Sequence, residues 1–79
     1  MNQYETEFVS ACPVNGKPIN YRLTIQANEV IMVEEIIKEI SKHTSGLHEQ
    51  IADALRESLG GSHTLRANHH GVTITTYRL

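Results

Sequence analysis

The sequence has no tryptophan, a single cysteine and two prolines among its 79 residues. One cysteine cannot form an internal disulfide, and no cysteine–histidine cluster has the spacing of a structural zinc site. A chain of this length is near the size at which a single hydrophobic core becomes marginal. We therefore predict one domain over residues 1–79 that gains further burial by self-association into a homo-oligomer.

The chain also has no long apolar run and no basic cluster. No stretch approaches the roughly 20 apolar residues that span a bilayer, and the N-terminal MNQYETEF lacks the basic start and apolar run of a leader. We expect a cytoplasmic protein that does not bind membranes. The net charge is −2 and the seven Lys and Arg residues are scattered, so there is no basic stripe for a phosphate backbone. Nucleic acid is expected only as a substrate held across several subunits.

Alternating side chains predict two hairpins. Residues 21–27 alternate strictly between apolar and polar, which indicates a half-buried strand. Residues 5–11 are its predicted partner, because Asn15-Gly16 supplies turn chemistry between the two segments, and Cys12 then sits where the first strand ends. Residues 64–68 and 72–78 predict a second hairpin, with His69-His70-Gly71 as its tight connection.

Apolar residues at helical spacing predict two amphipathic helices between the hairpins. The first covers about residues 30–43, and its apolar stripe consists of Val30, Val33, Ile36, Ile37 and Ile40. The second covers residues 47–59 and ends at Gly60-Gly61, a pair suited to a helix C-terminus. Its stripe consists of Leu47, Ile51, Ala54, Leu55 and Leu59.

This order of elements predicts an α+β fold, strand-strand-helix-helix-strand-strand, with a four-stranded antiparallel sheet and both helices on one face. The other face carries Arg22, Thr24 and Gln26, which are too polar for a dry core. The sheet would also have open edges. Both features favour closure of several subunits into a barrel.

Two segments resemble a known family. CPVNGKP, from Cys12 to Pro18 and followed by a strand, resembles the cysteine segment of the nitrile reductases of queuosine biosynthesis, which belong to the tunnelling fold. His48-Glu49 in LHEQIADAL resembles the His-Glu pair that these enzymes and their archaeal amidinotransferase relatives carry at the start of the second helix. VEEIIKEI and HHGVTITTYR also resemble the amidinotransferase-like members. The resemblance covers most of the chain.

The resemblance implies a ββααββ tunnelling fold whose subunits join into a barrel. It implies a planar purine or pterin held between neighbouring protomers and anchored by Glu49. It further implies that Cys12 attacks the nitrile of 7-cyano-7-deazaguanine to form a thioimide. The family places an aspartate proton donor seven residues after the cysteine, where this chain has Ile19.

The resemblance implies NADPH only for the reductase branch. Glu34 matches the leading glutamate of the reductases' cofactor motif and is a second substrate-binding candidate, although its other interpretation is a solvated helix residue. The serine and lysine pattern that follows in the reductases is replaced here by EIIK. This difference favours the amidinotransferase branch, which has no such motif, and no cofactor is assigned.

Each candidate residue has a chemical and a structural interpretation. Cys12 would act as a thiolate nucleophile, or it is a small buried hydrophobe. Glu49, in the first turn of its helix, would accept hydrogen bonds from a guanine-like ring, or it only complements the helix dipole. His48 would shuttle a proton beside Cys12, or it is a surface residue away from the apolar stripe. His69 and His70 are neighbours on a strand and point to opposite faces, so they cannot easily share a metal, and we assign them structural or loop roles.

The sequence thus leads to one main hypothesis and two alternatives. The main hypothesis is an enzyme of 7-deazaguanine metabolism, amidinotransferase-like or nitrile reductase-like, that acts through a Cys12 thioimide. The first alternative is a catalytically silent purine- or pterin-binding or assembly module of the same fold, motivated by Ile19. The second is a zinc-dependent relative of GTP cyclohydrolase, which IADALRESLG resembles, but the expected second cysteine ligand is absent and no metal is predicted.

Overall fold

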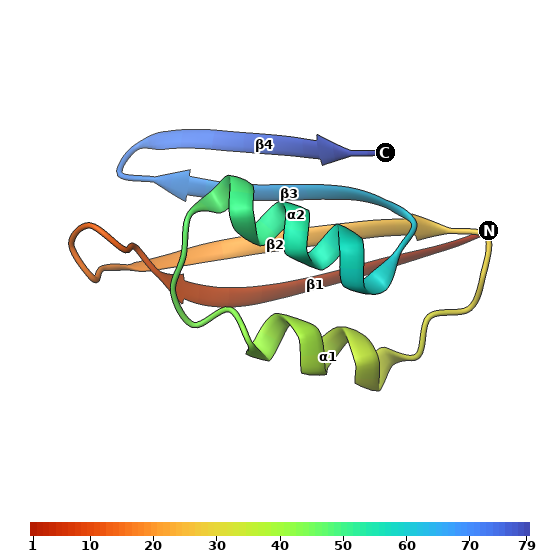
Figure 1. The fold of residues 1–79 in the computed structure, drawn as a ribbon. Helices are drawn as coiled ribbons and strands as arrows, with labels where there is room; N and C mark the ends of the chain where they lie inside the picture. The colour runs from red at the N-terminus through yellow and green to blue at the C-terminus, as the bar shows by residue number, and fades with distance from the viewer.

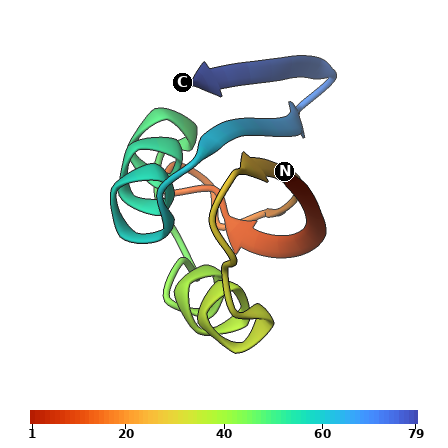
Figure 2. The ribbon, with the colours of Figure 1, turned by 90° about the vertical axis from the view of Figure 1, so that its right-hand side faces the viewer.

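The computed structural model describes residues 1–79 and shows two β-hairpins flanking a pair of helices (Figure 1). The elements in chain order are β1 (Asn2–Ala11), β2 (Pro18–Ala27), α1 (Val33–Ser41), α2 (His48–Leu59), β3 (Ser62–His69) and β4 (Val72–Arg78). The strands form one antiparallel sheet in the order β1-β2-β3-β4. Both helices lie on the same side of this sheet (Figure 2). The predicted α+β fold and its element order are confirmed.

The alternation predicted for β2 sets the core. Tyr21, Leu23 and Ile25 are each 1% exposed, whereas Arg22 and Gln26 lie on the opposite, solvent-facing side. The core cluster draws on α1, α2, β2 and β3 and consists of Ile19, Tyr21, Leu23, Ile25, Ile36, Ile51, Ala52, Leu55, Leu65 and Ala67. Burying one large aliphatic side chain of this kind contributes about 1.5–3 kcal/mol. The core therefore lies between the sheet and the helices, with α2 at its centre.

Three of the four strands are longer, and the first helix is shorter, than the sequence pattern predicts. β1 begins at Asn2 rather than at residue 5, because its first residues pair with the end of β2. These residues are polar and give no alternation signal, although their backbone groups join the ladder. α1 begins at Val33 rather than at Val30, since Met32 is extended with φ −68° and ψ 131°. β3 likewise begins at Ser62, two residues before the predicted start.

The turn between β3 and β4 needs an unusual backbone. Its two central residues, His70 and Gly71, have φ values of 55° and 96°. Positive φ at both central positions is the geometry of a type I′ hairpin, which matches the twist of the flanking strands. The side chain of Asn68 supports the turn, because its Oδ1 accepts a hydrogen bond of 2.9 Å from the Gly71 amide. His69 is therefore the last residue of β3, and His70 lies in the turn.

α1 buries only part of its apolar stripe. Ile36 is 5% exposed and joins the core, but Val33 is 57% and Ile37 is 56% exposed. Val30, which the sequence places in the stripe, precedes the helix and is 78% exposed. Contiguous exposed apolar side chains are typical of an interaction surface. Self-association stays a prediction. No helix is both long and apolar enough to cross a bilayer.

Candidate functional site

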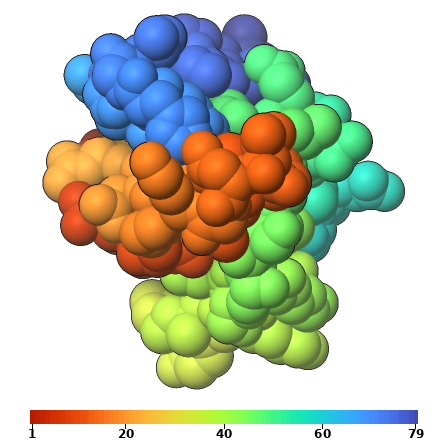
Figure 3. Space-filling model, turned by 90° about the vertical axis from the view of Figure 1, so that its left-hand side faces the viewer, coloured from red at the N-terminus to blue at the C-terminus, as the bar shows by residue number.

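One end of the sheet brings together the β1–β2 loop, the start of α2 and the β3–β4 turn (Figure 3). In this view the orange loop meets the green segment before α2 and the blue end of β3. A cavity of about 300 Å³ lies here, lined by Cys12, Pro13, Val14, Ile19, Gly46, Leu47, His48, Glu49, His69 and Ile74. Three of the four predicted site residues, Cys12, His48 and Glu49, thus share one cavity.

Cys12 directly follows β1 in a loop that closes on its own backbone. The Cys12 amide donates to the Lys17 carbonyl at 2.8 Å, and the Gly16 amide donates to the Cys12 carbonyl at 2.8 Å. The side chain is partly exposed. A hydrogen bond with His70, supported by the backbone of Asn15 and Val14, lowers the pKa of the Cys12 thiol to about 7. A thiol with that pKa is about half ionised at neutral pH, and the thiolate is the reactive form.

Asn15 orients the imidazole beside Cys12. Its Oδ1 accepts a hydrogen bond of 3.0 Å from the Lys17 amide, which leaves its Nδ2 facing Nε2 of His70 at 3.2 Å. Because Nδ2 only donates, Nε2 of His70 is the acceptor, and the neutral ring carries its hydrogen on Nδ1. That Nδ1–H is available to a thiolate. The sequence predicts only a loop role for His70, because His70 and Asn15 are 55 positions apart and meet only when the two hairpins pack together.

His48 is buried beneath the cavity, with 5% of its surface exposed. Its Nε2 lies 3.2 Å from the Leu65 carbonyl oxygen, and its Nδ1 lies 2.9 Å from Nε2 of His69. Both ring nitrogens are therefore engaged. Burial, followed by the charge of His69, lowers the pKa of His48, so the ring is neutral at neutral pH.

The alternative interpretation of His48 as a surface residue is wrong. It shares a helix face with Ile51, Ala52 and Leu55, all of which are buried, because residues three and four apart lie on the same side of a helix. The apolar stripe of α2 therefore begins one residue after the predicted start and includes the imidazole. The group next to the Cys12 thiol is His70 rather than His48.

His69 also lines the cavity rather than serving only as a loop residue. Its ring meets Tyr21 edge to face, with centroids 5.7 Å apart and an interplanar angle of 79°. Tyr21 in turn stacks on Phe8 at 5.1 Å. Burial, with a smaller contribution from His70, lowers the pKa of His69. The structure thus places this histidine in contact with both the core and the cavity.

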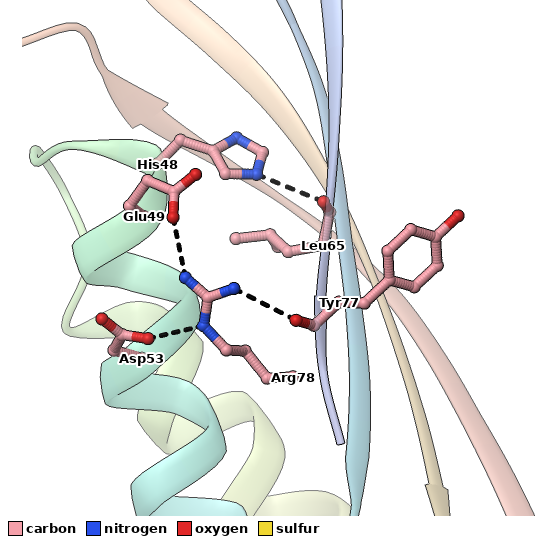
Figure 4. A network of polar contacts seen from close by, with 6 residues as sticks. All are labelled: His48, Glu49, Asp53, Leu65, Tyr77 and Arg78. Atoms are coloured by element: carbon pink, nitrogen blue, oxygen red, sulfur yellow. Dashed lines mark hydrogen bonds and ion pairs between the residues drawn. The ribbon is translucent and has the colours of Figure 1, made fainter.

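Glu49 is held by an arginine from β4 (Figure 4). Its Oε2 accepts a hydrogen bond of 2.8 Å from Nη2 of Arg78, whose Nε donates to Oδ1 of Asp53 at 2.6 Å and whose Nη1 donates to the Tyr77 carbonyl at 3.1 Å. Hydrogen bonds to Asp53 and Glu49 raise the pKa of Arg78. One carboxylate oxygen of Glu49 is fixed in this way, and the other has no protein partner. Arg78 was not predicted. Glu49 and Asp53 are four residues apart and share one helix face, and a cation between two such acids offsets their repulsion, so this pair is the feature that could have indicated an arginine.

Glu34 lies apart from the other candidates. It is exposed on α1 and does not line the cavity. The residues that follow in the chain include Ile36, which is buried in the core, and Ile37, which is apolar. Ile36 and Ile37 offer no hydrogen-bond donors to the phosphates of NADPH, and Lys38, which is exposed, is the one donor of this segment. Glu34 as a substrate-binding residue stays a prediction.

Two other observations define the chemistry of the site. Ile19 lines the cavity and is 4% exposed, so this part of the wall is apolar. No group of three or more His, Cys, Asp and Glu side chains is placed to hold a metal ion. A larger hollow of about 670 Å³ lies at the other end of the sheet, around Met1 and Gly60–Ser62, and contains none of the predicted site residues.

The fold is similar to a solved structure. The archaeosine synthase QueF-like in its apo form superimposes with a TM-score of 0.80 at 18% sequence identity, covering 98% of this chain and 89% of that chain. The sequence matches no protein-family model and no curated protein. The likeness shows the fold, and it confirms the tunnelling fold predicted from the cysteine and His-Glu segments.

Proposed function

We propose that the protein is an enzyme of 7-deazaguanine metabolism that binds 7-cyano-7-deazaguanine and attacks its nitrile with Cys12. The observation that carries this proposal is the shared cavity, in which a thiol with a pKa of about 7 and the carboxylate of Glu49 line the same wall. A volume of about 300 Å³ is at the lower end of the range for small-molecule sites and suits a bicyclic base. The likeness to an archaeosine synthase supports the choice of a 7-deazaguanine substrate.

The chemistry follows from the thiolate. Its lone pair adds to the nitrile carbon, so that a sulfur–carbon bond forms and one carbon–nitrogen π bond breaks. The nitrile nitrogen takes one proton, and the product is a thioimide on Cys12. An amine then attacks the same carbon and displaces the thiol, which gives an amidine. We favour this second step over hydride transfer because EIIK replaces the serine and lysine pattern of the reductases' cofactor motif in α1.

Glu49 orients the base in this proposal. Its free oxygen accepts hydrogen bonds from ring N–H and amino groups, while the hydrogen bond from Arg78 holds the other oxygen in place. The cavity is open and Cys12 is partly exposed, and in this proposal a second copy of the chain covers the base and excludes water. The proposal therefore includes a homo-oligomer in which a neighbouring copy lies over the cavity.

Intact mass spectrometry tests the proposal. Incubation with 7-cyano-7-deazaguanine is expected to add the mass of the nitrile to the wild-type chain and nothing to Cys12→Ala. Glu49→Gln is expected to form the adduct only at higher nitrile concentration, because a neutral amide is a weaker acceptor. Absence of a wild-type adduct, or an equal adduct on Cys12→Ala, would remove the proposal.

A second candidate is a catalytically silent module that binds a purine or pterin. The apolar wall at Ile19, which has no group to exchange a proton, favours it. This candidate predicts that the wild-type chain and Cys12→Ala bind the base equally well, with no mass adduct on either. Turnover with an amine donor would rule it out.

A further inference from the structure

The apolar wall at Ile19 belongs to the same cavity as a histidine on the neighbouring strand. In the β2–β3 ladder Tyr21 pairs with Ala67 and Leu23 pairs with Leu65. The paired residues end at Tyr21 and Ala67, and the same register extended by two residues would bring His69 opposite Ile19. Both residues line the cavity with Cys12 and Glu49. A proton donor absent from position 19 is thus available from the adjacent strand.

The hydrogen bonds of His48 determine which nitrogen of His69 is free. A backbone carbonyl can only accept, so Nε2 of His48 donates to the Leu65 oxygen and carries the hydrogen of the neutral ring. Nδ1 of His48 is then an acceptor, and the Nε2–H of His69 donates to it at 2.9 Å. Nδ1 of His69 is left unprotonated and has no partner in the protein. It gains or loses a proton without breaking any bond of this chain.

We propose that His69 carries a proton between the Cys12 thiol and the nitrile nitrogen of the substrate, through Nδ1. This role rests on the proposed function, since it concerns the same reaction. His48 is a positioning residue in it: it holds the His69 ring and fixes its tautomer, and does not itself exchange the proton.

The proton and electrons balance within the site. The thiol of Cys12 gives its proton to Nδ1 of His69, and the sulfur lone pair forms the bond to the nitrile carbon. The electrons of the broken π bond move to nitrogen, which takes the proton from Nδ1 and becomes the imine N–H of the thioimide. His69 returns to its neutral form, and no oxidant, reductant or other reactant is consumed.

The charged and titratable groups around His69 come from every element packed against it. His48 lies on α2 with Glu49 beside it, His70 is next in the chain, and Cys12 lies in the β1–β2 loop. Tyr21 of β2 closes the ring's inner side. Arg78 of β4 is hydrogen-bonded to Glu49 and brings a positive charge to the same side. Burial lowers the pKa of His69, so its ring is a neutral proton acceptor before the reaction.

The experiment compares two rates in each variant. Iodoacetamide alkylation of Cys12 needs only the thiolate, whereas formation of the adduct with 7-cyano-7-deazaguanine also needs the proton. His69→Gln keeps an N–H for His48 but cannot carry the proton. It is expected to leave alkylation within about 2-fold of wild type and to slow adduct formation about 100-fold, a typical loss for a general acid or base. His70→Gln is expected to slow both rates together, and His43→Gln, a histidine outside the cavity, to change neither.

A second variant tests the geometry. Adding Ile19→Asp to His69→Gln places a carboxyl group on the opposite strand and is expected to restore at least 10-fold of the lost adduct rate, a fraction of the usual general-acid effect. Where these variants lose their fold by circular dichroism, ¹⁵N NMR of the wild-type chain decides instead. It is expected to show His69 at neutral pH with hydrogen on Nε2 and none on Nδ1.

Equal adduct rates for wild type and His69→Gln, or an Nδ1–H tautomer of His69, overturn this inference and leave the proposed function intact. Absence of any adduct on the wild-type chain overturns the proposed function and the proton-carrying role with it. The two failures are therefore distinguishable.

Discussion

Removing the imidazole beside Cys12 should make the thiol less reactive at neutral pH. The hydrogen bond from His70 is the largest of the effects that lower the pKa of Cys12 to about 7, and the backbone of Asn15 and Val14 contributes less. In His70→Ala we therefore expect the pKa to return most of the way toward the ordinary thiol value of about 8.5. The thiolate fraction at pH 7 then falls from about one half to roughly 3–10%. Alkylation at pH 7 should slow by about 5- to 15-fold.

The assay is the rate of iodoacetamide alkylation as a function of pH, followed by intact mass. The wild-type profile should reach half of its plateau near pH 7. The His70→Ala profile should reach half of its plateau about 1 to 1.5 pH units higher, at a similar plateau, because the thiolate itself is unchanged. His43→Ala serves as the matched control. Superimposable profiles for His70→Ala and wild type would refute the assigned contact between His70 and the thiol.

Four further predictions concern an ion pair, a core side chain, a buried hydroxyl and two buried histidines. Arg78→Ala should weaken binding of the base several-fold in calorimetry and leave the melting temperature nearly unchanged, because an exposed ion pair adds little stability; unchanged binding would show that Arg78 does not orient Glu49. Leu55→Ala, at a side chain that is 0% exposed, should lower the free energy of unfolding by about 2–5 kcal/mol in urea titrations, and a loss below about 1 kcal/mol would contradict the core described. Ser10→Ala should raise the free energy of unfolding by about 1 kcal/mol, since the buried hydroxyl has no hydrogen-bond partner. Destabilisation by this substitution would mean that the hydroxyl has a partner. Burial lowers the pKa of His48 and of His63 in the fold, so stability should be complete above the unfolded pKa of about 6.5 and decline as the pH falls below it; a melting temperature that is flat from pH 7.5 to 5 would count against this.

The fold could be predicted from the sequence because the strand and helix patterns are each set by residues close together in the chain. The strict alternation of β2 and the helical spacing of α2 each depend on neighbouring residues, and both elements lie close to their predicted positions. The start of β1 could not be predicted in this way, since Asn2 pairs with Ala27 through backbone groups alone. The start of α1 was predicted too early, because Val30 fits the apolar spacing of the helix but lies before its first residue.

The site is only half predictable for a related reason. Cys12 and Glu49 lie in motifs, and the structure places both at one cavity. The groups that contact them, His70 and Arg78, come from the second hairpin and are distant in the chain. Their positions depend on how β3 and β4 pair with β2 and pack against α2, which brings together residues that are far apart in the sequence.

Tyr21 distinguishes the His48–His69 pair from Cys12 and His70, and the two pairs should respond differently when the protein is perturbed. It is 1% exposed, stacks on Phe8, and touches the rings of both His48 and His69. The imidazole pair is therefore fixed by the core, and its geometry should change only with changes that unfold the domain. Cys12 and His70 lie instead in connections at the surface, where fewer packed neighbours restrain the backbone. Association with a second copy would cover these connections and not the core, so it should alter the reactivity of the thiol while leaving the His48–His69 contact unchanged.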